Sequence, residues 1–267
     1  MSVYNGQRYL KGCLESILRQ TFSDYEFIIV NDGSTDDTVA ILGEYESDAR
    51  FVLIHNTKNI GLTKSLNKAL RKARGQFIAR MDADDLSLPD RLAKQHEFLL
   101  NSRDTGVVGS NYYEIDEDGG KRGEIILPET DDDIRRKIMR MNPFNHGAVM
   151  MRGEALETVG LYNERFRYAQ DYELWYRMLK QYKGHNLQEK LLMKRNPVGS
   201  ITVSKKRKQI AYTLWAIHKG RKLFEPTIAD RIHYAKYMMI YCTPQCVLKR
   251  LRTIKTRARK HYYTVKL

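Results

Sequence analysis

The chain has 267 residues, of which 42% are hydrophobic and 29% charged, and this balance is ordinary for a soluble globular protein. Its three cysteines are odd in number and lack nearby histidines, which argues against a disulfide framework or structural zinc and for a reducing compartment. The net charge is +14, no apolar run approaches the ~20 residues of a membrane span, and the N-terminus lacks the basic start and apolar stretch of a secretory signal.

Helix and strand patterns alternate along the first two hundred residues. Short apolar runs predict buried strands at 26–30, 51–54, 77–81, 106–111 and 148–151. Apolar residues repeating on one face predict helices at 7–20, 36–45, 62–73, 90–101, 131–141 and 171–182. A polar hairpin or loop is predicted at 116–121. The alternation predicts an α/β fold with a mostly parallel central sheet.

The beginning of the chain departs from this pattern. A doubly wound sheet begins with a strand, yet the chain opens with residues typical of the loop that follows one. Only Ser2 and Val3 can belong to a first strand. Because losing a central strand exposes the backbone groups of both neighbours, we expect a truncated first strand and a natural chain that begins upstream.

The most informative segment is the acidic turn 82–85, which contains Asp82, Asp84 and Asp85. It follows the predicted strand 77–81, and open α/β sheets bind their ligands at the carboxyl ends of strands. Clustered carboxylates repel one another unless a hard cation or a hydrogen-bonded ligand offsets the repulsion. The residues alone leave two interpretations open, a metal–phosphate site or an acidic turn.

The C-terminal part differs in charge. Residues 205–267 hold 17 Lys and Arg against 2 Asp and Glu, whereas the other 204 residues hold 29 basic and 30 acidic residues. We therefore divide the chain into an α/β domain, 1–203, and a basic amphipathic helical region, 204–267. The charge of this region predicts that it contacts an anionic membrane surface. The alternative is that the region forms a solvated helical face that covers the body.

Several segments together resemble the family 2 glycosyltransferases. They are 3–6, 16–21, 28–36, 59–67, 80–85, 89–92 and 170–175. The resemblance covers roughly residues 2–200 and implies a GT-A fold, a Rossmann-like α/β sandwich. It also implies transfer of a sugar from a nucleotide-diphosphate donor with inversion at the anomeric carbon. The Gln-x-x-Arg-Trp signature of processive members is missing, which implies a single transfer.

The resemblance assigns the acidic turn to the donor and its metal. Asp84 matches the family's metal ligand, for Mn²⁺ or Mg²⁺. Asp82 matches the residue that meets the ribose or assists the metal, and Asp85 is expected to help with the metal or the sugar. The chemistry agrees, because a divalent cation stabilises the negative charge that gathers on a departing diphosphate.

Four more residues receive roles from the resemblance. Asp171 matches the catalytic base that takes the proton of the acceptor hydroxyl. Without the resemblance, it is typical of an acidic residue in the first turn of a helix, where the helix dipole favours negative charge. Asp32 is expected to contact the nucleotide base, with a turn cap as its alternative, and Tyr4 to line the same pocket. His146 is expected on the acceptor side, although a lone histidine is more often structural.

We expect a metal-dependent hexosyltransferase that moves one sugar, from a UDP-sugar in the first place, to a glycan or lipid-linked acceptor in cell-surface polysaccharide biosynthesis. It is expected to be cytoplasmic and peripheral on the inner face of the cell membrane. Three rival interpretations remain: a nucleic-acid-binding protein acting through the basic tail, a nucleotidyltransferase, and a catalytically degenerate glycosyltransferase body. Nucleic acid is the less favoured partner because the body carries no nucleic-acid module.

Overall fold

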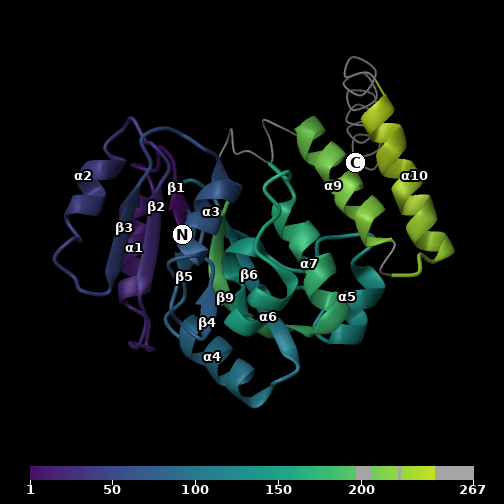
Figure 1. Cartoon of the computed structure of the whole chain (residues 1–267), viewed down its shortest axis with the longest axis horizontal. Helices are drawn as coiled ribbons and strands as arrows, with labels where there is room; N and C mark the ends of the chain where they lie inside the picture. The colour runs from purple at the N-terminus through teal and green to yellow at the C-terminus, as the bar shows by residue number, and fades with distance from the viewer. Residues whose placement is uncertain (197–205, 222–223, 244–267) are drawn as a thin grey trace, which may run out of the picture.

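The computed structural model describes residues 1–196, 206–221 and 224–243, which form two sheets covered by helices (Figure 1). The smaller sheet is parallel and has the order β1-β2-β3. Its strands are β1 (Ser2–Val3), β2 (Phe27–Asn31) and β3 (Phe51–His55), joined through α1 (Leu10–Leu18) and α2 (Thr38–Gly43). β2 is buried along its whole length, as its continuous apolar run predicts.

The larger sheet has six strands in the order β4-β8-β6-β9-β5, with β7 paired to β6. Its strands are β4 (Phe77–Ala79), β5 (Leu86–Ser87), β6 (Thr105–Ile115), β7 (Lys121–Ile125), β8 (Met150–Arg152) and β9 (Lys183–Arg195). The helices of this half are α3 (Leu62–Leu70), which leads into β4, then α4 (Arg91–Asn101), α5 (Asp131–Lys137), α6 (Gly153–Val159) and α7 (Gln170–Gln181).

The predicted α/β fold is confirmed, and the strand directions correct the expectation of a mostly parallel sheet. Parallel pairing is limited to the smaller sheet and to β6 with β9. The β4–β8, β6–β8, β5–β9 and β6–β7 pairs are antiparallel. A tight turn joins β6 to β7 and requires opposite directions, whereas a short apolar run carries no information about direction. The polar strands β7 and β9 were not predicted.

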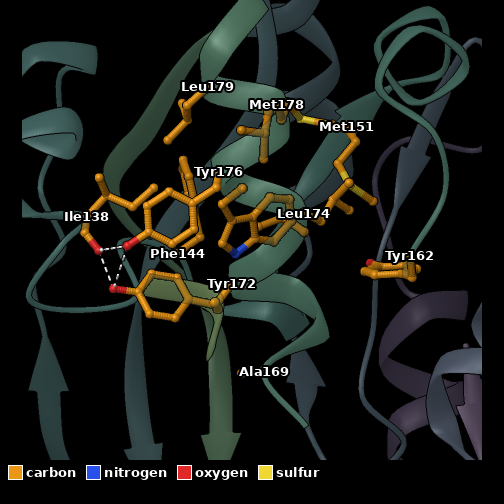
Figure 2. Packing of buried hydrophobic residues seen from close by; sticks show 14 of the residues in the cluster. Ile138, Phe144, Met151, Tyr162, Ala169, Tyr172, Leu174, Tyr176, Met178 and Leu179 are labelled. Atoms are coloured by element: carbon orange, nitrogen blue, oxygen red, sulfur yellow. Dashed lines mark hydrogen bonds between the residues drawn. The ribbon is translucent and has the colours of Figure 1, made fainter. Parts of the chain in front are cut away.

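The main core forms around α7 (Figure 2). Trp175 is fully buried there and meets the Phe144 ring edge to face at 5.3 Å between centroids. The hydroxyls of Tyr172 and Tyr176 both donate to the carbonyl oxygen of Ile138, the second at 3.0 Å. These contacts hold the N-terminal end of α7 against the segment that follows α5.

Two helices follow the body, α9 (Lys206–Gly220) and α10 (Ile228–Cys242), and α10 lies at the edge of the molecule (Figure 1). Trp215 of α9 stacks on Phe166 with ring centroids 4.1 Å apart, so this helix packs on the catalytic body. Thr227 and Asp230 form a capping box at the start of α10. The basic runs 249–252 and 255–260 lie outside the described residues. Within the described ranges, no helix is both long and apolar enough to cross a bilayer.

Candidate active site

The acidic turn lies between β4 and β5 and is held by Arg195, the last residue of β9. The backbone of β9 supplies one contact, since the Arg195 amide donates to Oδ1 of Asp85 at 2.8 Å. The Arg195 side chain supplies the others: Nε donates to the Asp84 carbonyl at 3.1 Å, and one terminal nitrogen reaches the carbonyls of Asp116 and Glu117. Arg195 therefore joins the turn to the β6–β7 hairpin.

A buried arginine balances part of the turn's charge. Arg80 is 5% exposed and forms an ion pair with Asp82. The two residues are two positions apart in an extended segment, so their side chains lie on the same side of the chain. Burial acts to raise the pKa of Asp82, but the guanidinium outweighs it and lowers the pKa to about 2. Asp82 is therefore ionised at neutral pH.

The other two carboxylates form no such ion pair among the described residues. Burial, and then repulsion from Asp82, raise the pKa of Asp84 to about 6. The same two causes raise the pKa of Asp85 well above its ordinary value. Oδ2 of Asp85 is buried without a hydrogen-bond partner in the described part of the chain. Such a cluster gains stability from a cation or a donated hydrogen bond.

The donor set fits a divalent cation only in part. The ligand atoms on offer are carboxylate oxygens, which Mg²⁺ and Mn²⁺ prefer. Within the residues that the structure describes, however, no three His, Cys, Asp or Glu side chains are arranged to hold a metal by themselves. A cation here would need further oxygen ligands, of the kind that a substrate diphosphate carries.

His146 begins a short 3-10 helix, His146–Ala148, that packs against the acidic turn. A Cβ on Gly147 would lie 2.8 Å from Oδ2 of Asp85, so only glycine allows this approach. Nε2 of His146 is 2.7 Å from the Tyr162 hydroxyl. Burial, and then the charge of Arg80, lower the pKa of His146 well below its usual value, so the imidazole is neutral.

Asp171 lies in the first turn of α7, directly after Ala169 and Gln170, with Ala169 in the left-handed conformation at φ 52°. Its Oδ2 accepts a hydrogen bond of 2.7 Å from Nδ2 of Asn142. Burial raises the pKa of Asp171, while Asn142 and Arg80 act to lower it. Burial, and then the charges of Asp171 and Asp82, raise the pKa of the Tyr162 phenol. The fold thus brings the acidic turn, His146 and Asp171 around Arg80 and Tyr162.

Asp32 directly follows β2, and Tyr4 directly follows β1. Asp32 is 2% exposed, and its carboxylate accepts hydrogen bonds of 2.9 Å from Nδ2 of Asn56 and from the amides of Ile60 and Gly61. Asp32 therefore anchors the loop before α3, an arrangement close to the turn-cap alternative. Tyr4 is 49% exposed, in a loop that Asn5 ties to Thr35. No contact described here joins either residue to the acidic turn.

Four residues that surround the site were not singled out from the sequence: Arg80, Asn142, Tyr162 and Arg195. A signal existed for Arg80, because a basic residue two positions before an acid on a strand faces the same side. The other three act from positions 16 to 111 residues away from their partners, and no local pattern marks such contacts.

Residues 1–160 match the model of the family described as "Glycosyl transferase family 2". The chain is 35% identical to the putative glycosyltransferase EpsE of Bacillus subtilis over 94% of this chain and 90% of that protein. It is 33% identical to the amylovoran biosynthesis glycosyltransferase AmsE of Erwinia amylovora over 78% of each. The mannosyltransferase PcManGT of Pyrobaculum calidifontis, solved with GDP-Man and Mn²⁺, shares the fold at a TM-score of 0.67 and 18% identity, over 98% of this chain and 80% of that one.

Proposed function

The chain belongs to glycosyl transferase family 2, and on this basis we propose that it moves one sugar from a nucleoside-diphosphate sugar to a glycan or lipid-linked acceptor of a cell-surface polysaccharide, with inversion. The observation that carries the proposal is the ion pair of Asp82 with buried Arg80, whose charge also lowers the pKa of Asp84 and of Asp171. The relative AmsE supports the polysaccharide context, since its name refers to amylovoran biosynthesis.

The acidic turn is the proposed site of the donor diphosphate. Asp84 would be the protein's ligand for Mn²⁺ or Mg²⁺, because its partly exposed carboxylate is short of counter-charge. A bound cation would neutralise the negative charge that develops on the departing diphosphate. Asp82 is held by Arg80 and would meet the ribose or support the metal. Asp85, buried and bonded to the Arg195 amide, would act on the metal or sugar from beneath the turn.

Asp171 is the proposed general base. In a single displacement, its carboxylate accepts the proton of the acceptor hydroxyl while that oxygen bonds to the anomeric carbon and the diphosphate leaves from the opposite face. Neutral His146, bonded to Tyr162, is proposed to contact the acceptor. The nucleotide base of the donor is proposed to bind beside Tyr4 and the loop that Asp32 anchors.

A thermal-shift screen tests this function. The full chain is mixed with UDP- and GDP-sugars in the presence and absence of Mn²⁺, and a bound donor is expected to raise the melting temperature by mass action. Release of nucleoside diphosphate on addition of acceptor glycans then separates an active enzyme from a degenerate body. A chain that binds no donor, and instead binds DNA in a salt-sensitive manner, would favour the nucleic-acid-binding alternative.

We also propose that α10 attaches the enzyme to the inner, anionic face of the cell membrane, where a lipid-linked acceptor would lie. Ile228, Ile232 and Met239 share one side of α10 and are 79%, 65% and 70% exposed. Helical geometry places the exposed Arg231 and Lys236 on the two flanks of this stripe. Like charges on both flanks disfavour pairing with a second copy and favour anionic lipid.

Sedimentation with liposomes containing phosphatidylserine tests the attachment. The full chain is expected to bind at low salt and to be released at high salt. Replacing Ile228 and Ile232 by Ser should weaken binding, whereas Ile126→Ser, at a body position that is 59% exposed, should not. No binding at low salt, or equal binding of the two variants, would rule the proposal out.

A further inference from the structure

The hydrogen bond to the proposed base comes from residues 138–142, a segment that belongs to no helix or strand. α5 ends at Lys137, and Asn142 donates to Asp171 at 2.7 Å. The side-chain amide of Asn142 is itself fixed, because its Oδ1 accepts a hydrogen bond of 3.3 Å from the Phe144 amide while Nδ2 faces Asp171. Whatever holds this segment therefore also holds the partner of the base.

Helix α7 holds the start of the segment. The hydroxyls of Tyr172 and Tyr176 donate to the Ile138 carbonyl (Figure 2). The Tyr176 hydroxyl also lies 3.5 Å from Sδ of Met139. These contacts anchor the first two residues of the segment, and the side chains of 140–142 find their partners elsewhere.

The C-terminal helix α10 holds the middle of the segment. Nε of Arg140 and Oδ1 of Asp230 form an ion pair at 2.9 Å. A terminal nitrogen of Arg140 donates to the Arg136 carbonyl at 2.7 Å, so the guanidinium joins the last turn of α5 to α10. Among the described residues, no other ion pair or hydrogen bond links α10 to the body, 1–196.

The surroundings of Asp230 favour this contact. Asp230 is the third residue of α10 and is 4% exposed. Its Oδ2 accepts hydrogen bonds from the amide and the hydroxyl of Thr227, at 2.9 and 2.6 Å, and its Oδ1 faces Arg140. A carboxylate buried to this extent is costly without a counter-charge, and Arg140 supplies one. The place of Arg140 is therefore tied to the start of α10.

Packing alone does not fix α10 closely at this place. A cavity of about 540 Å³ lies between α9, α10 and the segment, and its lining includes Met139, Ile217 and Tyr234. Close packing normally holds one element in a single position on another, and here the cavity interrupts it. The position of the segment relative to α10 therefore depends on the buried ion pair.

We propose that Asp230 is a positioning residue for the transfer reaction: it holds Arg140 and the segment 138–142, and so sets the orientation of Asp171. Helix α10 is then part of the catalytic unit as well as an attachment helix. The inference rests on the proposed glycosyl transfer, because that function gives Asp171 its role as the base. The contacts from α10 to the start of α7 do not depend on it.

Amide hydrogen exchange tests these contacts without any substrate. Asp230→Asn keeps an oxygen that can cap α10 and removes the charge that Arg140 faces. The amides of Arg140 and Met141 both donate to the Lys137 carbonyl, and their exchange is expected to become about fivefold faster or more. Glu225→Gln removes one negative charge from an exposed position just before α10 and should leave both rates unchanged. Equal rates in the two variants would overturn the proposal.

The pH profile of transfer separates positioning from simple support of the fold. A looser segment weakens the hydrogen bond from Asn142, and the pKa of Asp171 then rises. Asp230→Asn should therefore lower kcat about threefold on the acid limb and less than twofold on the plateau, with KM for the donor unchanged. A uniformly lower kcat with an unmoved acid limb would show that Asp230 only supports the fold.

A double variant checks that the effect passes through Asn142. Asp230→Asn is placed in the Asn142→Ala background, where the acid limb should move no further. An added shift would overturn the proposal, because Asp230 would then act through the other groups that influence the base, Arg80 and the phenols of Tyr162 and Tyr172. If the wild-type chain releases no nucleoside diphosphate from UDP- or GDP-sugars, the proposed function fails, and the exchange rates still decide whether α10 holds the segment.

Discussion

Nδ2 of Asn142 donates a 2.7 Å hydrogen bond to Oδ2 of Asp171 at the start of α7. Asn142 belongs to the segment that follows α5, which the hydroxyls of Tyr172 and Tyr176 fix at the Ile138 carbonyl (Figure 2). The core around α7 therefore sets the orientation of the proposed base. An orientation fixed by packing suits a group that must meet an acceptor hydroxyl at hydrogen-bond distance.

Asp171→Asn removes the proton acceptor and preserves the shape of the side chain. We expect donor affinity to stay within a factor of two or so, while the rate of transfer falls by about 10²–10⁴, the usual contribution of a general base. Donor binding is measured by thermal shift and transfer by release of nucleoside diphosphate. Asp133→Asn, in the first turn of α5, is the matched control. A near-normal rate for Asp171→Asn would remove Asp171 from the proposed role.

Asn142→Ala should shift the pH dependence of transfer. The hydrogen bond from Asn142 lowers the pKa of Asp171, so its loss raises that pKa further above the ordinary value. A base works when deprotonated, and activity falls as the pH drops through its pKa. The acid limb of the rate profile is therefore expected to move to higher pH. An unmoved limb accompanied by a uniformly lower rate would indicate a purely structural role.

Asp84→Ala should abolish the effect of divalent cations. Wild-type protein with a UDP- or GDP-sugar is expected to melt at a higher temperature when Mn²⁺ is added, because a cation held by Asp84 would strengthen donor binding. In the variant the Mn²⁺-dependent part of the shift and the turnover should both disappear. Asp24→Ala, at an exposed position, should retain both. Metal-dependent turnover that survives in Asp84→Ala would contradict the assignment.

Arg195→Lys keeps the positive charge but loses the planar fork that reaches the carbonyls of Asp84, Asp116 and Glu117. We expect the acidic turn to loosen and the Mn²⁺ concentration needed for half-maximal activity to rise about tenfold. Arg122→Ala removes an exposed ion pair with Asp116 on the same hairpin and should change stability by less than about 1 kcal/mol. Equal Mn²⁺ requirements for the two variants would separate Arg195 from the metal site.

Gly33→Ala should be strongly destabilising. Gly33 has φ 72°, and a Cβ there would lie 2.5 Å from the backbone carbon of Lys58, in the loop that Asp32 anchors. Positive φ and a backbone clash together predict a loss of about 2 kcal/mol or more. Gly43→Ala, in α2 with open space around it, should be neutral or slightly stabilising. Chemical denaturation compares the two, and similar midpoints would contradict the prediction.

The helices and the acidic turn were predictable because their signals are local. The spacing of Leu10 and Leu14 marks a helix face, and the continuous apolar run of β2 marks a buried strand. The strands that were missed, β7 and β9, are polar and owe their pairing to β6, which β7 meets across a tight turn and β9 meets from far away along the sequence. Asp32 shows a different limit: the sequence marked it as a candidate site residue but gave no sign that its carboxylate accepts hydrogen bonds from the amides of Ile60 and Gly61.

The sequence by itself determined the family motifs, the place of Asp82, Asp84 and Asp85 after a strand, and the uneven distribution of charge. The tertiary structure decided which of these acids is neutralised, because the buried Arg80 forms its ion pair with Asp82, while burial and the charge of Asp82 raise the pKa of Asp84 and Asp85. It also decided that Asn142 orients Asp171. The physical reason is that burial and pairing depend on the side chains that packing brings together, and those partners lie far apart along the chain.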